Sequence, residues 1–276
     1  MMSTITRTTI LIASGPILAL ILSACGQHAD NQQTAAPVAD EASAAPATSI
    51  YEDAVANDAR PEADRARDAG RKPAEVLAFL GITPGMTVLD MFSGGGYYTE
   101  ILSYTVGDSG RVIAQTNEAY LQFVGDEFEE RYLGGRLGNA QVLMAENNEL
   151  KLEAESLDAI LLVLSFHDLF YAAPEQGWPA IDIAAFLAEL YSGLRTGGVV
   201  GIIDHYAAEG APSDTGGTTH RIDAAIVIAM MTEAGFELDA QSDMLRNPDD
   251  DYEKVVFDPE IRGKSDRFVM RFRKPE

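Results

Sequence analysis

Apolar side chains recur along most of this chain in runs that alternate between strand-like and helix-like spacing. Helical spacing covers residues 51–80, 97–106, 181–194 and 221–234, and the first of these stretches is broken near Pro61 and Pro73 into two or three short helices. Short apolar, β-branched runs cover residues 86–91, 111–115, 141–145, 157–164 and 199–204. The alternation predicts a parallel sheet with helices on both faces.

The end of the chain departs from this alternation. Two further strands are expected at 236–245 and 267–273, and a long polar loop without helical spacing joins them. A connection without a crossover helix favours an antiparallel final pair.

The first 24 residues form a segment of another kind. They carry one charge, Arg7, followed by the apolar run 10–21, which is the pattern of a secretory signal peptide. Residues 25–49 are mostly small and polar, so they are expected to form a disordered tether. The folded domain is expected over residues 50–276.

The apolar run ends in Leu22-Ser23-Ala24-Cys25-Gly26, which resembles the lipobox of bacterial lipoproteins. The resemblance implies cleavage before Cys25 and lipidation of that cysteine, which would anchor the domain to a membrane of the cell envelope, facing the periplasm. An ordinary signal peptide or an uncleaved anchor remains the alternative. Cys25 is the only cysteine, so the domain has no disulfide and no thiolate chemistry.

Charge narrows the choice of partners. The chain has 43 acidic and 20 basic residues and a formal net charge of −23. A surface of this sign repels phosphate backbones, so no nucleic-acid partner is expected.

A glycine-rich turn follows the first predicted strand. Asp90 ends the strand, and Phe92, Ser93 and the glycines Gly94, Gly95 and Gly96 lead into the next helix. Strand, glycine turn and helix in this order allow a ligand to approach bare backbone. A tight turn that binds nothing is the competing interpretation.

The segment from Val88 to Gly96 resembles motif I of class I S-adenosylmethionine-dependent methyltransferases, with Phe92 in place of the first glycine. From Arg60 to Lys274 the chain is similar to a bacterial group of predicted methyltransferases. The resemblance rests on residues 65–73, the glycine turn, 166–168, 220–223, 245–248 and 262–268. It implies an α/β, Rossmann-like methyltransferase fold, with a seven-stranded, mostly parallel sheet and an antiparallel last strand, and S-adenosylmethionine as cofactor.

The same resemblance points to further cofactor-binding residues. The acid that binds the ribose in this family is missing, because the second strand ends in Ala114-Gln115-Thr116-Asn117. Asn117 or Gln115 is left to bind the diol through an amide. Glu146 and Asn147 are candidates for the adenine site, unless Glu146 is a solvated loop acid. Tyr97 and Tyr98 are expected either to line the cofactor or to pack at the helix start.

The histidines of the domain all fall at predicted strand ends or helix starts. His167 and Asp168 follow the fourth strand, Asp204 and His205 end the fifth, and His220 opens the next helix. The carboxyl ends of parallel strands meet at one edge, so these candidate catalytic residues are expected to converge. His167 is the preferred general base, oriented by Asp168 or Asp204. Each histidine taken alone is equally compatible with a structural role.

These observations predict methyl transfer to an unidentified small acceptor. A metal-dependent enzyme is an alternative, since the histidines and aspartates are possible ligands, although their spacing forms no tight motif and no metal is assigned. A noncatalytic ligand-binding lipoprotein is another, because an exported domain is separated from cytoplasmic S-adenosylmethionine. The sequence indicates no oligomeric state.

Overall fold

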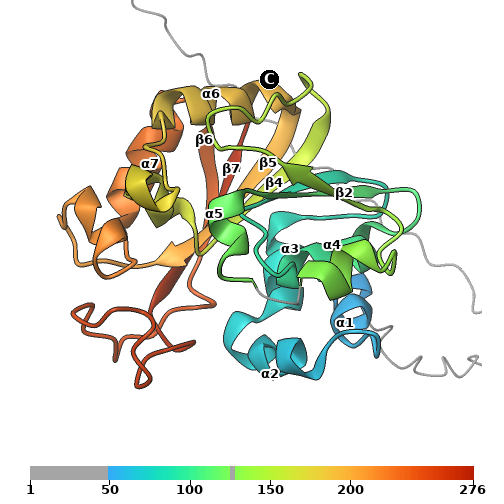
Figure 1. Ribbon diagram of the computed structural model, residues 1–276, viewed down its shortest axis with the longest axis horizontal. Coiled ribbons are helices and arrows are strands. Elements are labelled where there is room, and N and C mark those ends of the chain that lie inside the picture. Colours follow the sequence, from blue (N-terminus) through green and yellow to red (C-terminus); the bar gives the residue numbers. More distant parts are fainter. Residues whose placement is uncertain (1–48, 125–127) are drawn as a thin grey trace, which may run out of the picture. The chain divides into compact units, whose positions relative to one another are not determined.

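A seven-stranded sheet forms the centre of the protein (Figure 1). The computed structural model describes residues 49–124 and 128–276. The strands are β1 (Thr87–Met91), β2 (Arg111–Thr116), β3 (Ala140–Met144), β4 (Leu157–Val163), β5 (Leu194–His205), β6 (Glu237–Ser242) and β7 (Arg267–Arg273). Their order is β3-β2-β1-β4-β5-β7-β6. The first five are parallel, and β7 runs antiparallel to both β5 and β6, which confirms the predicted fold class.

Helices cover both faces of the sheet. They are α1 (Ile50–Val55), α2 (Glu62–Arg71), α3 (Pro73–Leu80), α4 (Tyr97–Val106), α5 (Glu118–Leu121), α6 (Ile183–Gly193) and α7 (Ala224–Glu233). Short turns of other helix types are η1 (Glu129–Leu133), η2 (Phe166–Phe170), η3 (Pro174–Gln176) and η4 (Ser213–Gly217). No helix within the described ranges combines the length and hydropathy needed to cross a bilayer. Cys25, the predicted signal peptide and the tether lie outside the described residues.

Alternation along the strands divides the apolar core in two. Leu89 and Met91 of β1 point to the face that α6 and α7 cover, whereas Val88 points to the face covered by α1, α3 and α4. Both sets are almost fully buried. Burial on both faces explains why these strands read as continuous apolar runs.

Several element boundaries differ from the prediction, and two of them show what sets the end of a helix. Helix α6 was expected to end in a glycine cap at residues 195–198, but it runs straight into β5 at the buried Leu194. The glycines instead pair with the end of the chain, where Gly197 N–H donates to the Lys274 carbonyl at 2.9 Å. Helix α7 begins at Ala224, three residues later than expected, because the Asp223 side chain caps it by accepting from Ala225 N–H at 2.9 Å.

The strand order indicates the edge of the sheet where a ligand is expected to bind. The chain moves outward from β1 through β2 to β3, then returns to add β4 on the other side of β1. The carboxyl ends of β1 and β4 therefore flank a crevice from which the connections leave in opposite directions. Open α/β sheets bind ligands at such a position.

Candidate active site

The turn after β1 adopts the backbone that its glycines allow. Gly94 and Gly96 have φ of 54° and 80°, and Phe92 has φ of 52°. Phe92 thus takes a left-handed conformation at the position where the methyltransferase motif has its first glycine. Its ring packs into the core against Tyr120 and Phe186, with centroids 5.1 and 6.1 Å away. This packing places the Phe92 ring in the apolar core beneath the turn.

The two outer glycines of the turn have different surroundings. A Cβ added to Gly96 would collide with Tyr132 and Arg131, so Gly96 permits close packing of η1. A Cβ added to Gly94 would meet only the carbonyl oxygen of Phe92, at 3.9 Å. Space beside Gly94 is therefore left free by the described residues, and a ligand can approach the backbone there.

Three buried hydroxyl groups lie at the carboxyl ends of β1, β2 and β4, the edge of the sheet that also carries Gly94. Ser93 follows β1, Thr116 ends β2 and Ser165 follows β4, and the Oγ atoms of all three have no hydrogen-bond partner among the described residues. A buried hydroxyl without a partner costs free energy. Three of them at the carboxyl ends of adjacent parallel strands indicate a polar ligand that supplies the missing bonds. The sequence analysis singled out Ser93 alone for binding.

The predicted ribose and adenine residues form one network at the ends of β2 and β3. Gln115 Oε1 accepts from Phe92 N–H at 3.0 Å, and its Nε2 donates to Asn147 Oδ1 at 3.3 Å. Asn117 Oδ1 caps α5 by accepting from Tyr120 N–H at 3.0 Å, while its Nδ2 donates to Glu146 at 3.3 Å. Gln115 and Asn117 each use both ends of the side-chain amide within the protein, so the exposed carboxylate of Glu146 is the group most open to a ligand.

Asp90 and Thr99 connect β1 to the first turn of α4. Asp90 is 3% exposed, and its Oδ2 accepts from the Thr99 hydroxyl at 2.6 Å. Burial raises the pKa of Asp90 to about 6, although the bonds from Thr99 oppose this shift. Asp90 therefore positions the helix that follows the glycine turn.

Tyr97 and Tyr98 pack at the start of α4, which is one of the two roles expected for them. The Tyr97 hydroxyl donates to Asp68 of α2 at 2.6 Å, and the Arg71 guanidinium lies 4.5 Å from its ring centroid. Tyr98 is 4% exposed and packs edge-on against Tyr97 at 5.1 Å. Both residues pack at the start of α4, and arginine side chains of the protein already contact the Tyr97 ring.

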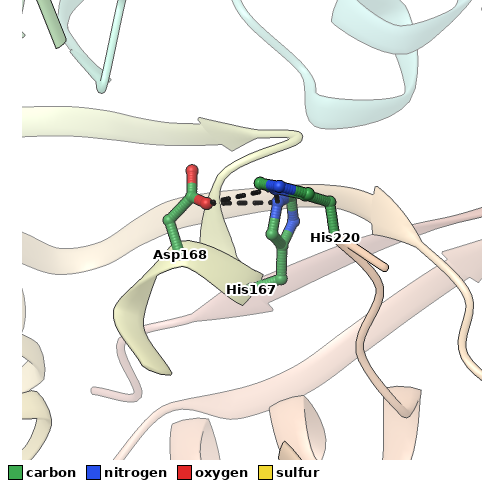
Figure 2. Close-up of side chains that lie close together, drawn as sticks. All are labelled: His167, Asp168 and His220. Carbon is green, nitrogen blue, oxygen red and sulfur yellow. Dashed lines mark hydrogen bonds and ion pairs between the residues drawn. The ribbon is translucent and has the colours of Figure 1, made fainter. Parts of the chain in front are cut away.

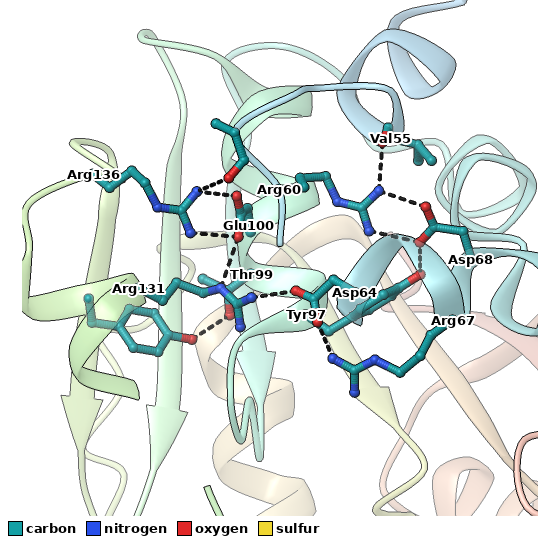
Figure 3. Close-up of polar contacts among 12 residues, drawn as sticks. Val55, Arg60, Asp64, Arg67, Asp68, Tyr97, Thr99, Glu100, Arg131 and Arg136 are labelled. Carbon is teal, nitrogen blue, oxygen red and sulfur yellow. Dashed lines mark hydrogen bonds and ion pairs between the residues drawn. The ribbon is translucent and has the colours of Figure 1, made fainter. Parts of the chain in front are cut away.

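A network of ion pairs that sequence reasoning missed holds α2 and η1 over α4 (Figure 3). Arg131 of η1 pairs with Asp64 of α2 and with Glu100 of α4, and Arg136 also pairs with Glu100. Arg131, Asp64 and Glu100 are each at most 3% exposed. The charged residues between 60 and 72 are evident in the sequence, but Arg131 of η1, the partner of Asp64, lies 67 residues further along the chain.

His167, Asp168 and His220 come together at the carboxyl edge of β4 and β5 (Figure 2). His167 Nε2 lies 3.2 Å from Asp168 Oδ1 and 3.2 Å from His220 Nδ1. The other ring nitrogen, Nδ1, lies 2.8 Å from Asp204 Oδ1, and Asp204 also accepts from the His167 backbone N–H at 2.9 Å. Two carboxylates and a second imidazole thus fix the His167 ring.

The charges of this cluster are strongly coupled. Burial lowers the pKa of His167, but Asp204 and Asp168 outweigh it and raise the pKa to about 10. Asp168 has a pKa held well below its usual value by His167 and His220 despite burial. Both ring nitrogens of His167 face carboxylates of the protein, and its expected role as general base stays a prediction. His220 is the accessible member, with a side chain 31% exposed against 3% for His167.

His205 does not join the cluster. Its ring centroid lies 6.1 Å from that of His167, and its Nδ1 lies 2.6 Å from the Ser265 hydroxyl. Successive strand residues point to opposite faces, so Asp204 reaches His167 while His205 turns away from it. Burial lowers the pKa of His205 well below its ordinary value, assisted by the positive charges nearby. The expected convergence therefore holds for His167, Asp168, Asp204 and His220 only.

Tyr120 links the two halves of the site. Its ring packs on Phe92 beneath the glycine turn, and its hydroxyl donates to Asp168 Oδ2 at 2.5 Å. Sequence reasoning did not single out Tyr120, because nothing in the local pattern of the short helix α5 places it against η2.

Comparisons with known proteins agree with this geometry. A family model described as protein-L-isoaspartate(D-aspartate) O-methyltransferase matches residues 51–124. No curated protein sequence matches the chain. A methyltransferase of Aquifex aeolicus described as SAM-dependent is similar in structure, with a TM-score of 0.54, 23% identity, and coverage of 77% of this chain and 95% of that one.

Other structures share the fold at lower identity. A putative sarcosine dimethylglycine methyltransferase from Galdieria sulphuraria has a TM-score of 0.52 and 17% identity, covering 77% of this chain and 88% of its own. The cyclase SpnF has a TM-score of 0.51 and 16% identity, covering 80% of this chain and 85% of its own. One member of the fold is therefore named for a different reaction. In its sheet order, its glycine turn and its structural likeness, this chain has the fold of class I S-adenosylmethionine-dependent methyltransferases.

Proposed function

We propose that the protein is an S-adenosylmethionine-dependent methyltransferase acting on a small acceptor. The observation that carries this proposal is the set of unpartnered buried hydroxyls of Ser93, Thr116 and Ser165 at the carboxyl ends of three adjacent strands, together with the open space beside Gly94. S-adenosylmethionine carries ribose hydroxyls, an amino group and a carboxylate, so it supplies hydrogen-bond partners for all three. The family-model match over residues 51–124 includes the turn and β2.

The residues at this edge fit the parts of the cofactor. The backbone around Ser93 and Gly94 would hold the methionine moiety, Thr116 and Asn117 the ribose, and Glu146 the adenine. The bound cofactor would supply a methyl group activated by a positively charged sulfur. Asn117 lacks the charge of a ribose-binding acid and already donates to Glu146 at 3.3 Å, so it would bind the diol only by giving up that bond, and Glu146 provides the nearest carboxylate.

The chain's own contribution to the reaction is alignment and proton transfer. Holding an acceptor in line with the methyl group removes much of the entropic barrier. His220, exposed at the rim of the cluster, would receive a proton from the acceptor. His167, Asp168 and Asp204 act as positioning residues that hold the His220 ring through the contact of 3.2 Å between the two imidazoles.

Calorimetry of the full chain with S-adenosylmethionine and S-adenosylhomocysteine tests the proposal. We expect one site for each and no change in either affinity in His220→Ala. Transfer of a labelled methyl group into the small-molecule fraction of a cell extract should fall at least tenfold in that variant. Absence of binding of both nucleosides at millimolar concentration would refute the assignment.

One observation favours a second candidate, a metal-dependent enzyme. Two imidazoles and a carboxylate converge with donor atoms 3.2, 3.2 and 3.8 Å apart. Metal bonds of about 2.1 Å at tetrahedral or octahedral angles separate neighbouring ligand atoms by about 3.0 to 3.5 Å. Asp204 on the far nitrogen of His167 is the outer partner that metal-binding histidines usually have. This set suits zinc or iron(II).

Titration of the full chain with Co²⁺, followed by its visible absorption and by competition with Zn²⁺, tests this candidate. We expect about one equivalent to bind and His220→Ala to weaken the affinity at least tenfold. His205→Gln is the matched control, since His205 faces Ser265 instead of the cluster. Equal Co²⁺ affinity in His220→Ala and in the unaltered chain would exclude the site.

We further propose that the domain is anchored in the cell envelope through a lipid on Cys25. The support is the signal-like pattern of residues 1–24, which ends at the only cysteine of the chain. Expressed in a bacterium, the chain should incorporate labelled fatty acid and sediment with membranes, and Cys25→Ala should do neither. Labelling of Cys25→Ala would show that another residue carries the lipid.

A further inference from the structure

A basic cavity lies between the end of α2 and the loop that precedes β7. Its volume is about 540 Å³, and it reaches the carboxyl ends of β4 and β5 at Leu164 and His205. Five basic residues line it, namely Arg67, Arg71, Arg262, Lys264 and Arg267. None of the lining residues is acidic, although the chain has 43 acidic residues and a net charge of −23.

Two of these arginines, the buried Arg267 and the half-buried Arg71, have no carboxylate partner among the described residues. Arg267 is 6% exposed, and its guanidinium donates only to the carbonyl oxygens of Gly70 at 2.7 Å and Ser265 at 3.2 Å. Arg71 lies against the Tyr97 ring at 4.5 Å and forms no ion pair with a described residue. Burial lowers the pKa of both arginines, and the neighbouring charges of Arg67 on Arg71 and of Arg71 on Arg267 lower it further.

Other buried arginines of this protein are compensated. Arg60 pairs with Asp68 at 2.8 Å, Arg221 pairs with Asp250 at 2.9 Å, and Arg131 pairs with two acids. A buried charge without a partner is costly. The cavity is therefore a place where the protein holds positive charge that a bound anion would neutralise.

The cavity adjoins the His167 cluster. The His205 ring, on its wall, lies 6.1 Å from the His167 ring, and Phe257, also on the wall, packs on His220 at 4.7 Å. From this placement, we propose that Arg71 and Arg267 bind an oxyanion, a carboxylate or a phosphate, carried by the methyl acceptor. The role of the anion's carrier as acceptor rests on the proposed methyltransferase function, whereas anion binding itself does not.

Calorimetry of the full chain with inorganic phosphate and with succinate, at constant ionic strength in chloride, tests the site and separates the two kinds of oxyanion. We expect one of them to bind at one site and Arg71→Gln to weaken it at least tenfold, with partial recovery in Arg71→Lys. Arg71 is chosen because Arg267 also ties Gly70 to the strand and its loss can affect folding. Arg195→Gln is the control, since Arg195 is 54% exposed at the opposite end of the sheet and pairs with Asp158.

Binding of S-adenosylhomocysteine shows whether the anion in the cavity belongs to the cofactor or to the acceptor. We expect its affinity to be unchanged in Arg71→Gln, and we expect it not to displace the oxyanion. If Arg71→Gln weakens S-adenosylhomocysteine as much as the oxyanion, the cavity holds the cofactor's carboxylate and the acceptor assignment is overturned. The proposed anion site itself is overturned if neither anion binds, or if Arg71→Gln binds the anion as tightly as the unaltered chain. Anion binding without nucleoside binding would instead refute the methyltransferase function alone.

Discussion

The side chain of Gln115 holds the backbone of Phe92, whose N–H donates to Oε1 at 3.0 Å. The same amide donates through Nε2 to the Ala145 carbonyl at 2.8 Å. Gln115 thereby joins the glycine turn after β1 to the end of β3 across the intervening strand. This connection stabilises the left-handed backbone of Phe92. It also gives the Gln115 amide a structural role near the place where the methyltransferase family has its ribose-binding acid.

Replacing Gln115 with methionine should therefore destabilise the fold. The substitution keeps the volume but leaves the buried Phe92 N–H and Ala145 carbonyl unpaired, which costs about 1 to 3 kcal/mol for each group. We expect the free energy of unfolding, measured by denaturant titration, to fall by about 2 to 4 kcal/mol. Gln141→Met on the exposed side of β3 is the control and should change it by less than about 0.5 kcal/mol. Equal effects at both positions would contradict the role of Gln115.

Gly94 allows a second prediction, which concerns affinity. Gly94→Val should reduce S-adenosylhomocysteine binding at least a hundredfold, because the new side chain fills the open space beside the turn. Gly81→Val is the matched control, since Gly81 also has a left-handed φ, of 74°, and open space around it. Both variants carry the same backbone strain. Binding lost equally in both, by calorimetry, would mean that strain and not exclusion is the cause.

The strands and the glycine turn were predictable because their signals are local. A buried strand and a helix differ in the period of their apolar residues, and a turn with positive φ selects glycine. The antiparallel ending followed from the absence of a crossover helix before β7. The boundaries at Leu194 and Asp223 were wrong because apolar spacing does not show the contacts that set them: Leu194 pairs with Leu157 of β4, and the Asp223 side chain caps α7.

The site was predictable only in part, because its chemistry depends on contacts between distant segments. His167 and His220 are 53 residues apart and meet as the common edge of parallel strands required. The role of Tyr97 stayed open between cofactor contact and packing, because its partner Asp68 lies 29 residues earlier on another helix. Strand alternation alone predicts that the side chains of Asp204 and His205 point to opposite faces of the sheet. The unpartnered hydroxyls of Thr116 and Ser165 have no sequence signal beyond following strand ends.

The pKa of Asp90 leads to a prediction about pH. The buried carboxyl has a pKa of about 6 in the folded chain against an ordinary value of 3.8. Between these values the unfolded chain releases this proton and the folded chain keeps it, so the stability contributed by Asp90 is complete below 3.8 and is lost as the pH rises through 6. The loss amounts to at most about 3 kcal/mol.

Asp90→Asn removes this titration, and the amide oxygen can still accept from Thr99. We therefore expect the stability of the unaltered chain minus that of the variant to fall between pH 4 and pH 6 and to stay level above that range. Denaturant titrations at several pH values measure the difference, which cancels the other carboxylates. A difference that does not change with pH would show that Asp90 titrates normally.

Arg131 carries the last prediction, because one guanidinium serves two buried acids on different helices. Its Nε donates to Glu100 at 2.9 Å, and its Nη2 bonds to Asp64 of α2. Arg131→Met leaves both acids with one partner fewer, and unfolding should become easier by about 3 kcal/mol. Arg195→Met, which breaks an exposed pair, should cost less than about 1 kcal/mol. Since Arg131 also covers Gly96, its loss should weaken S-adenosylhomocysteine binding, whereas Arg195→Met should not. Equal stability of the two variants would mean that water, and not Arg131, compensates Glu100 and Asp64.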